Sequence, residues 1–276
     1  MDSGWNYRYP ACNADAMIPD ELKPENGPAT ALVTGAGKRL GAAFARALAA
    51  DGWSLVIHCH DSDAEALALA DELRSLHGRP MQVLEQDLAA PDAGAALFSR
   101  CIAPPTLLIN NASRFDEDRL EDFCVADWDR HMAINLRAPA LLTQAFAATL
   151  PHAARGLIIN LLDAKLSALN PDFFSYTISK IGFAGLSELS ARALAPRIRV
   201  NAIAPSVTLV SGPQTRENFE AAHVRNALGR GVTVDHLVAA LRYLICTPTV
   251  TGQTLTVDSG IRFLGMPRDV AYMVEK

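Results

Sequence analysis

Cysteine is scarce and scattered in this sequence. The five residues are Cys12, Cys59, Cys101, Cys124 and Cys246, with no Cys-x-x-Cys pair and no histidine-rich neighbours. An odd, unpatterned set indicates neither a disulfide framework nor a zinc site. We therefore expect no bound metal, and we expect most of these cysteines to be small buried hydrophobic residues.

Long apolar runs and an excess of basic charge are also missing. No run reaches the ~18 residues that a membrane span needs, and the first residues, MDSGWNYRYP, lack the apolar core of a secretory signal. The formal net charge of −5 argues against a nucleic-acid-binding surface. We therefore expect a soluble, cytoplasmic protein whose partners are small molecules.

The beginning of the chain differs in composition from the rest. Residues 1–28 contain four prolines and several acidic residues without a sustained apolar period, which is typical of a flexible N-terminal tail. Docking of Trp5, Tyr7 and Tyr9 is the alternative, and the role of the tail stays open. No linker divides residues 29–276, so we expect one domain there.

Short apolar runs alternate with helical patterns from Ala29 onward. The strand-like segments are ATALV, WSLVIHCH, PMQVLEQDL, TLLINNAS, GLIINLLDA, RVNAIAPS and QTLTVDSG. Helical segments such as LGAAFARALAADG and TISKIGFAGLSELSARALA separate them, which favours right-handed βαβ units. The sequence therefore predicts the α/β class, with one Rossmann-like, doubly wound parallel sheet of about seven strands and helices on both faces. Ligands of such a sheet bind at the carboxyl ends of the strands.

A glycine-rich turn follows the first predicted strand. Residues 34–41 read TGAGKRLG and lead into a predicted helix. Such a turn directs backbone N–H groups and the positive end of the helix dipole at a pyrophosphate. Alone it is a weak signal, because glycine turns between strands and helices also occur for steric reasons.

Tyr176 and Lys180 lie four residues apart in FSYTISKIGFAGL, so both project from one face of a predicted long helix. A phenol with an ordinary pKa near ~10 is a poor proton donor or acceptor at neutral pH unless a cation stabilises its anion. Lys180 is placed to supply that cation. In isolation such a pair more often only packs, so the motifs around it decide its meaning.

Together these motifs resemble those of the short-chain dehydrogenase/reductase family. TGAGKRLG is similar to its TGxxxGxG turn, with Arg39 in place of the middle glycine, and Tyr176 and Lys180 lie downstream as the family requires. NNAS at 110–113 is similar to its NNAG strand end, with serine in place of glycine. The resemblance extends from about residue 29 to residue 262, nearly the whole predicted domain.

The resemblance implies roles for individual residues. Tyr176 and Lys180 would act in catalysis, and Asn135 matches the helix asparagine that holds a water in the proton relay. Asp87 and Leu88 match the pair that contacts adenine. The residues implied in cofactor binding are Gly35, Lys38, Arg39, Leu40, Gly41, His60, Ser62, Asp87, Leu88, Asn111, Ala112, Tyr176, Lys180 and Pro205.

The end of the second predicted strand bears on the choice of cofactor. An acid about 20 residues past the turn usually binds the free adenosine ribose of NAD. Here the strand end lies nearer His60 than Asp61. His60 and Ser62, with Lys38 and Arg39, suit a 2′-phosphate instead. We therefore expect NADPH, and Asp61 keeps NADH open.

Asp163 departs from the family pattern, which usually has serine 13 residues before the catalytic tyrosine. An ionised carboxylate cannot donate a hydrogen bond to a substrate carbonyl, although it accepts one from Tyr176. Asp163, Arg39 in the turn and the run NNASRF resemble the pteridine reductases and the dihydromonapterin reductases. This resemblance implies hydride transfer from NADPH to a 7,8-dihydropterin such as dihydromonapterin or dihydrobiopterin, and which pterin is used stays open.

In that subgroup the aromatic residue two positions after the serine, here Phe115, stacks on the pterin and sandwiches it against the nicotinamide. A role in the core or in a lid is the alternative for Phe115. Residues 206–231 are expected to form the substrate loop. The catalytic set is Asp163, Tyr176, Lys180 and Asn135, and the substrate-binding set is Arg39, Ser113, Phe115, Asp163, Tyr176, Val207 and Leu209.

Two other functions stay open. A short-chain reductase of a ketone or a 3-oxoacyl thioester would carry Asp163 only as a tolerated variant. A non-catalytic dinucleotide-binding regulator would keep the fold, but the complete set of Asn135, Tyr176 and Lys180 argues against it.

Family members are commonly tetramers that pair through the helix carrying the tyrosine and the lysine. The resemblance therefore implies a homotetramer. Gly182, Ala184 and Gly185 on that predicted helix permit close approach of another helix, but they do not require it.

Overall fold

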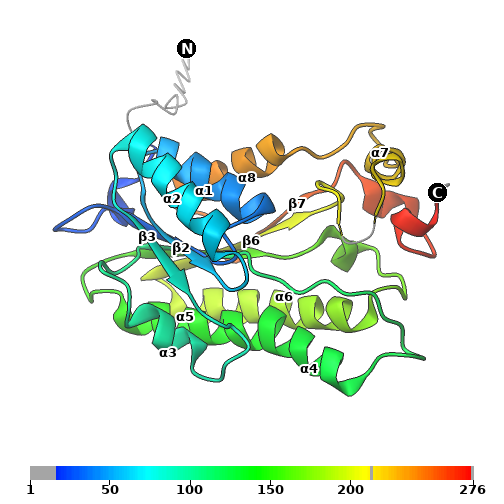
Figure 1. Cartoon of the computed structure of the whole chain (residues 1–276), viewed down its shortest axis with the longest axis horizontal. Helices are drawn as coiled ribbons and strands as arrows, with labels where there is room; N and C mark the ends of the chain where they lie inside the picture. The colour runs from blue at the N-terminus through cyan, green and yellow to red at the C-terminus, as the bar shows by residue number, and fades with distance from the viewer. Residues whose placement is uncertain (1–16, 212–213, 275–276) are drawn as a thin grey trace, which may run out of the picture.

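The computed structural model describes residues 17–211 and 214–274, and its centre is one sheet of seven parallel strands. The strand order is β3-β2-β1-β4-β5-β6-β7 (Figure 1). The strands are β1 (Thr30–Val33), β2 (Ser54–Cys59), β3 (Met81–Glu85), β4 (Leu107–Asn110), β5 (Gly156–Leu161), β6 (Ile198–Pro205) and β7 (Thr254–Val257). The predicted fold class is confirmed.

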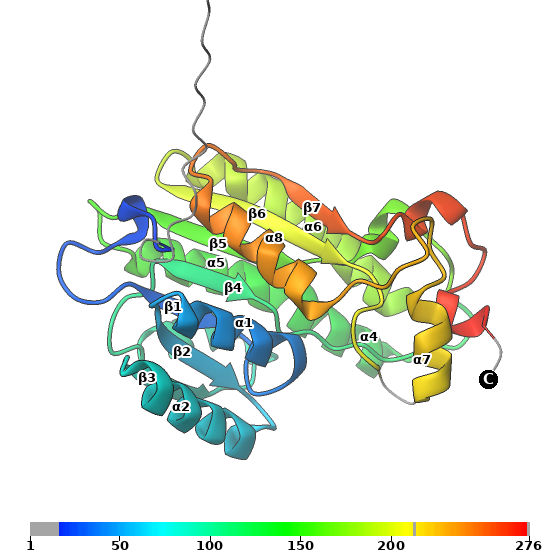
Figure 2. The ribbon, with the colours of Figure 1, turned by 90° about the horizontal axis from the view of Figure 1, so that it is seen from above.

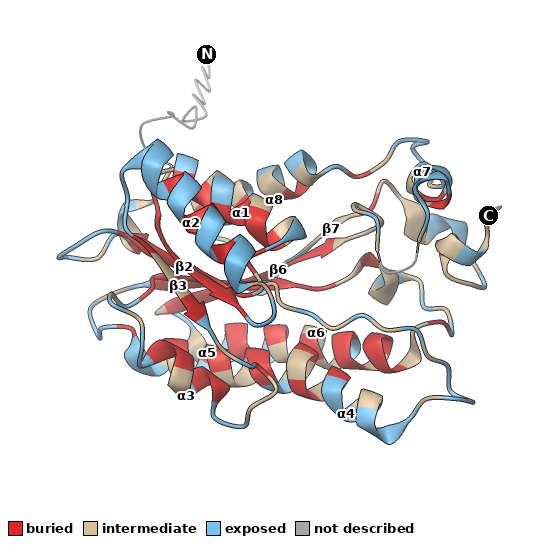
Figure 3. Cartoon of the chain, in the orientation of Figure 1, coloured by how far each residue is buried: buried red, intermediate tan, exposed pale blue. Residues whose placement is uncertain are grey.

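Helices cover both faces of the sheet (Figures 1 and 2). One layer holds α1 (Arg39–Ala50), α2 (Asp63–His77) and α8 (Val234–Cys246), and the other holds α3 (Ala93–Phe98), α4 (Val125–Met132), α5 (Ala138–Thr149) and α6 (Phe174–Leu194). Figure 3 shows the sheet buried between the two layers. Every residue of β1, β2, β4 and β5 is buried, which is why these strands read as continuous apolar runs rather than alternating ones.

The two faces of the sheet contribute to separate hydrophobic cores. Along β1, Ala31 and Val33 pack into the core under α1, α2 and α8, and Leu32 packs into the core under α3 and α5. This alternation follows from the period of two along a strand. The sheet is thereby fixed between two packed layers, and its carboxyl edge is held rigidly.

Several short elements escaped the sequence pattern. The helix α4 continues into α5 through a π-helical turn, Ala133–Arg137, and the predicted substrate loop contains the helix α7 (Arg216–His223). Four 3₁₀ helices also occur among the described residues: η1 (Asp20–Leu22), η3 (Ala164–Ser167), η4 (Ile261–Leu264) and η5 (Val270–Tyr272). None of the described helices is both long and apolar enough to cross a membrane.

Part of the predicted tail lies against the domain. Leu22 is fully buried in the core under α1, α2 and α8. The Thr106 hydroxyl donates to the carbonyl of Leu22 (2.7 Å), and the Glu21 carboxylate pairs with Arg199 (3.1 Å). Residues 1–16, which include Trp5, Tyr7 and Tyr9, lie outside the described residues.

The core under α3 and α5 provides a test of the packing. Phe146 of α5 is fully buried, meets Phe98 edge to face with ring centroids 6.2 Å apart, and covers Gly156 of β5. We expect Phe146→Ala to lower the free energy of unfolding by about 3–5 kcal/mol, because it leaves a cavity. Urea unfolding measures this loss. Tyr243→Ala, at a half-exposed position of α8, should cost far less, and equal losses would contradict the packing described.

Candidate active site

The candidate site lies at the carboxyl edge of the sheet. The chain passes outward from β1 to β3 and then returns to place β4 beside β1. Such a reversal opens a crevice beyond the strand ends, where ligands of this sheet type bind. The glycine turn after β1, the NNAS segment after β4 and the Asp163 segment after β5 all follow strands at this edge.

Asp163 and Tyr176 are joined directly. The Tyr176 hydroxyl donates to one oxygen of the Asp163 carboxylate (2.7 Å), and the other oxygen accepts from the backbone N–H of Lys165 (2.8 Å). The second bond caps the helix η3 and fixes the carboxylate. The Lys180 ammonium lies 5.7 Å from the centre of the Tyr176 ring and donates to the carbonyl of Leu161 (2.7 Å). The structure therefore brings the three residues together, with the phenol bonded to aspartate.

The surroundings set the protonation states of this group. Burial raises the pKa of the Tyr176 phenol well above its ordinary value, and the charge and hydrogen bond of Asp163 raise it further. Burial lowers the pKa of the Lys180 ammonium to about 8, although Asp163 opposes the change. At neutral pH the pair is therefore a neutral phenol that donates to a carboxylate, beside a lysine that is still mostly charged.

Asn135 lies in the π-helical turn and is fully buried. Its side-chain N–H₂ donates to the carbonyl of Arg114 (2.9 Å) and to the Ser179 hydroxyl (3.0 Å). Its side-chain oxygen accepts from the backbone N–H of Arg114 (2.8 Å) and from the Ser113 hydroxyl (3.2 Å). Asn135 thus ties the segment after β4 to α6 through protein partners on both sides of its amide.

Aromatic rings gather beside Tyr176. Phe115 stacks on Phe173 with ring centroids 4.3 Å apart and an interplanar angle of 19°, and it meets Tyr176 edge to face at 4.7 Å. Phe115 keeps 40% of its surface exposed. Phe115 is therefore not a core residue, although its ring packs against two others. Its exposed part offers an aromatic surface to a flat ligand beside the phenol of Tyr176.

The glycine turn is shaped so closely that side chains would not fit. A Cβ on Gly41 would lie 2.2 Å from the carbonyl oxygen of Gly35, and Gly35 itself has a φ of +62°. The side-chain amide of Asn111 donates to the carbonyls of Thr34 (2.8 Å) and Gly35 (3.2 Å), and the Thr34 hydroxyl accepts from the backbone N–H of Ala112 (3.0 Å). Asn111 and Ala112 therefore brace the turn from β4.

His58 is a residue of this turn that sequence reasoning missed. Its Nδ1 accepts from the backbone N–H of Gly35 (3.1 Å), so its Nε2 carries the hydrogen and donates to the carbonyl of Gln86 (2.9 Å). Its own carbonyl accepts from the N–H of Ala36 (2.8 Å). Burial lowers the pKa of His58 to about 4, so the ring stays neutral. Inside an apolar strand, a lone histidine gave no sequence signal for this role.

The basic residues of the turn have partners of their own. The Lys38 ammonium pairs with Glu65 of α2 (2.7 Å). The Arg39 guanidinium crosses to the predicted substrate loop, where it donates to the carbonyl of Val210 (2.5 Å) and to the Ser211 hydroxyl (3.0 Å). Arg39 therefore links the glycine turn to the predicted substrate loop.

Other residues predicted to bind the cofactor follow the carboxyl ends of β2 and β3. His60 and Asp61 are exposed beyond β2, with Nε2 of His60 3.5 Å from the Asp61 carboxylate. Ser62 precedes α2 without a capping hydrogen bond from its side chain, which lies against Gly37. Leu88 is buried and Asp87 is exposed after β3, where its carboxylate accepts from the backbone N–H of Ala89 (2.8 Å).

The segment beyond Pro205 has half-buried side chains. Pro205 ends β6, and Val207 and Leu209 follow it at the carboxyl edge. The His223 ring of α7 bonds the Val207 carbonyl (2.9 Å), which holds the loop against its own helix.

A group of charged residues near the site also escaped prediction. The Asp172 carboxylate pairs with Arg268, and the Lys165 ammonium lies 3.8 Å from Asp269. Tyr272 stacks on Phe173 at 6.0 Å. These contacts join positions about 100 residues apart, so no local sequence spacing could predict them.

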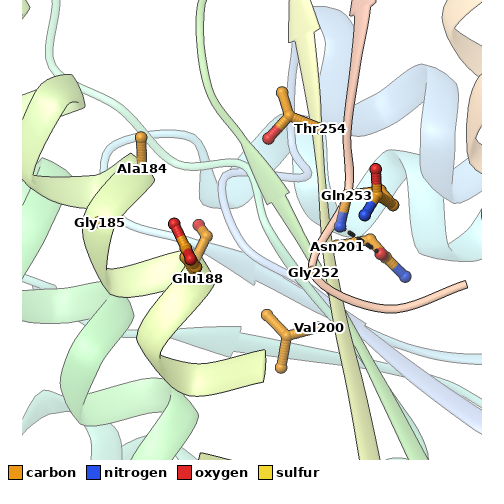
Figure 4. A pocket seen from close by; sticks show the side chains of 9 residues that line it. Ala184, Gly185, Glu188, Val200, Asn201, Gly252, Gln253 and Thr254 are labelled. Carbon is orange, nitrogen blue, oxygen red and sulfur yellow. Dashed lines mark hydrogen bonds between the residues drawn. The ribbon is translucent and has the colours of Figure 1, made fainter. Parts of the chain in front are cut away.

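A separate hollow of about 260 Å³ lies between α6 and the starts of β6 and β7 (Figure 4). Glu188, Asn201 and Gln253 are among its lining residues, and the backbone N–H of Gln253 donates to Asn201 (3.0 Å). It lies toward the amino ends of the strands, away from Tyr176 and Asp163. Within residues 17–211 and 214–274, no cluster of three His, Cys, Asp or Glu side chains is placed to hold a metal ion.

His58 gives the protein a measurable pH dependence. Between pH 6.5 and about 4 the unfolded chain binds a proton at this histidine while the folded chain does not. Stability from this group is therefore complete above pH 6.5 and is lost by about 3 kcal/mol as the pH falls to 4, at about 1.4 kcal/mol per pKa unit. We expect His58→Asn to lose less unfolding free energy than the unchanged protein between pH 7 and pH 4.5, because asparagine accepts from Gly35 without titrating.

Urea unfolding at the two pH values measures the difference. His77→Asn, at the exposed last turn of α2, is the control and should retain the pH dependence of the unchanged protein. Equal pH dependence in His58→Asn and the unchanged protein would show that His58 is not held neutral.

Comparison with known proteins agrees with this architecture. The sequence of residues 29–221 matches the family model described as short chain dehydrogenase. Among solved structures, FolM alternative dihydrofolate reductase 1 from Brucella suis, in complex with NADP, has a TM-score of 0.81 and 37% identity, covering 85% of this chain and 95% of its own. The Brucella canis counterpart, complexed with NADP, has a TM-score of 0.79 and 36% identity, with coverage of 85% and 94%.

A relative outside the FolM proteins shares less of the sequence. The 3-oxoacyl-[acyl-carrier-protein] reductase of Synechocystis sp. is 30% identical and covers 84% of this chain and 96% of its own length. The family match, the parallel sheet and the pair of Tyr176 and Lys180 on α6 lead to one conclusion: the chain is a member of the short-chain dehydrogenase/reductase family.

Proposed function

We propose that this protein is an NADPH-dependent reductase that transfers hydride to a 7,8-dihydropterin and forms the tetrahydropterin. The observation that carries the proposal is the hydrogen bond from Tyr176 to Asp163 (2.7 Å), at a position where the family usually has serine. A serine hydroxyl donates to a substrate carbonyl, whereas an ionised Asp163 only accepts. The FolM proteins, which are similar along most of the chain, support a pterin-like substrate.

The residues present fit NADPH. The turn leaves no space for a Cβ at Gly41 and has a positive φ at Gly35, and the first N–H groups of the 12-residue helix α1 lack intrahelical acceptors. Lys38 and Arg39 add positive charge at the same place, which favours the additional phosphate of NADPH. When bound, NADPH supplies the hydride that C6 of the dihydropterin accepts.

The chain's own residues orient the substrate and hold the proton. Phe115 would offer its exposed surface to the flat pterin ring, and Ser113 and Arg39 would donate hydrogen bonds to the edge of that ring. Tyr176 keeps its proton at neutral pH, because burial and Asp163 raise the pKa of its phenol. Asp163 orients the Tyr176 hydroxyl, whose proton would pass to N5 through water and be returned from solvent after hydride transfer, while the charge of Lys180 offsets the negative charge on the phenol. Lys180 would also bind the ribose beside them. Holding both rings in place supplies much of the acceleration.

A substrate comparison with the purified protein and NADPH tests the proposal. We expect oxidation of NADPH with dihydrobiopterin or dihydromonapterin, and little with acetoacetyl thioesters. The thioester is the informative competitor, because a relative from Synechocystis sp. is a 3-oxoacyl-[acyl-carrier-protein] reductase. Turnover of the thioester alone would refute the pterin proposal and support a reductase of a ketone or a 3-oxoacyl thioester instead.

Variants of the phenol separate an enzyme from a binding protein. We expect Tyr176→Phe to lower kcat/KM for the dihydropterin roughly 10²- to 10⁴-fold, which is the typical contribution of a positioned proton donor. NADPH binding, followed by fluorescence titration, should persist. Tyr243→Phe, on the exposed side of α8, is the matched control. Full activity in Tyr176→Phe would refute catalysis by this residue.

We also propose that the protein is a homotetramer that uses α6 as one of its contacts. Ile181 and Leu189 of α6 are exposed apolar residues, and a Cβ on Gly185, which lies between them on the same stripe, would meet open space. Gly182 has a different role, because a Cβ there would lie 2.8 Å from Leu136 of the same chain.

Light scattering after size exclusion tests this assembly. We expect a mass of about four times 29.6 kDa, and a smaller assembly for Leu189→Asp and Ile181→Asp. Leu76→Asp, which replaces a similarly exposed leucine on α2, is the control. An unchanged mass in both α6 variants would exclude this contact.

A further inference from the structure

Three aromatic rings from distant parts of the chain form a column beside the candidate site. Phe173 lies between Phe115 and Tyr272, at 4.3 Å and 6.0 Å between ring centroids, and its ring is within 20° of parallel to both. Phe115 follows β4, Phe173 precedes α6, and Tyr272 belongs to η5 near the end of the described chain. Offset stacking of this kind favours a defined ring orientation.

The residue before Phe173 holds the C-terminal segment. The Asp172 carboxylate is 3% exposed and accepts from the Arg268 guanidinium (2.7 to 2.9 Å) and from the backbone N–H of Asp269 (2.7 Å). Burial opposes ionisation of Asp172, but these donors outweigh it and hold its pKa below the ordinary value. A buried carboxylate needs such donors, so Asp172 and Arg268 restrain each other's segments.

Lys165 fixes the same point from a third direction. Its ammonium donates to the backbone carbonyl of Asp172 and lies 5.2 Å from the centre of the Phe173 ring. Phe173 has a φ of +54°, which a residue with a side chain adopts only under restraint from its surroundings. Contacts from Asp172 and Lys165 supply that restraint.

The C-terminal segment also reaches the predicted substrate loop. Asn218 of α7 donates to the carbonyl of Ala271 (2.9 Å), and Arg225 donates to the carbonyl of Met273 (2.9 Å). Burial and the nearby Glu117, two residues after Phe115, raise the pKa of the Tyr272 phenol. Residues 268–273 therefore connect the wall formed by Phe115 and Phe173 with the helix α7.

We infer that Asp172, Arg268 and Tyr272 are positioning residues for the substrate: they hold Phe173 behind Phe115 and so set the angle of the ring on which the substrate stacks. The inference rests on the proposed function, because it needs a flat aromatic substrate on Phe115. The three residues touch neither the glycine turn nor Lys180 in the contacts described. Their effect is therefore confined to the substrate and spares the cofactor.

Two pairs of variants of the full chain test the inference. We expect Tyr272→Ala to raise the KM for dihydropterin about tenfold, with kcat changed less and the Kd for NADPH unchanged, because a released ring loses its preorganised orientation. Tyr272→Phe keeps the stack and should retain the original KM. Arg268→Met should act like Tyr272→Ala, because it removes the guanidinium donors of Asp172.

Arg242→Met is the matched control for the ion pair. Arg242 and Asp51 form a similar pair, with the arginine 39% and the aspartate 8% exposed, against 40% and 3% for Arg268 and Asp172. Loss of either pair should lower thermal stability alike, but only Arg268→Met should raise the KM for dihydropterin. Comparing KM, kcat, NADPH affinity and Tm for all four variants separates positioning from general stability.

The outcomes are distinct. An unchanged KM in both Tyr272→Ala and Arg268→Met, with the parent protein active on dihydropterin, would overturn the inference and leave the proposed function standing. A parallel rise in the Kd for NADPH, or an equal rise of KM in Arg242→Met, would overturn it as well, because either indicates a general structural role. Absence of dihydropterin turnover in the parent protein would remove the proposed function and the inference with it.

Discussion

The hydrogen bond between Tyr176 and Asp163 constrains the whole candidate site. It joins a fully packed phenol of α6 to a carboxylate that caps η3 after β5, so it fixes the distance between these two elements at the sheet edge. Because the carboxylate accepts, the phenol must keep its proton, and the Lys180 ammonium bonds the carbonyl of Leu161. A serine at position 163 would leave the phenol free to donate to a substrate instead, which is why the proposed chemistry depends on this residue.

The sheet determines which parts of the site are robust. Turns that follow β1, β4 and β5 are held by buried strands and by bonds between neighbours, such as those of Asn111 and His58 to Gly35. These parts form the half of the site that we propose for the cofactor. The half that we propose for the substrate depends on segments outside the sheet, namely residues 164–173, the helix α7 and residues 268–273. Contacts among loops, not strand pairing, therefore shape that second half.

Sequence pattern predicted the sheet because its signals are local. Buried parallel strands read as apolar runs, helices as amphipathic segments, and the spacing of Tyr176 and Lys180 survives folding because both lie on one helix. Short elements were not predicted, because their local signals are weak. The helix α3 has only six residues, and the π-helical turn at Asn135 has no periodic pattern of its own. His58 was missed because its bond to Gly35 depends on the register between β1 and β2.

The contacts around Phe173 could not be predicted from local sequence patterns, because they join distant parts of the chain. In the sequence, Arg268 and Asp172 have the pattern of ordinary surface charges. They are 96 positions apart, and the Asp172 carboxylate is buried only once the chain has folded. Burial then makes the pair indispensable, because an uncompensated carboxylate at that depth would cost more than the pair gains. The burial of Asp172 cannot be recognised in the sequence. It also restrains Phe173, because a buried carboxylate that needs its donors holds the neighbouring residues of the chain in place. The proposed cofactor site at a local motif and the proposed substrate wall held by a long-range charge pair thus depend on separate parts of this fold, so a change at Asp172 or Arg268 would alter the second and spare the first.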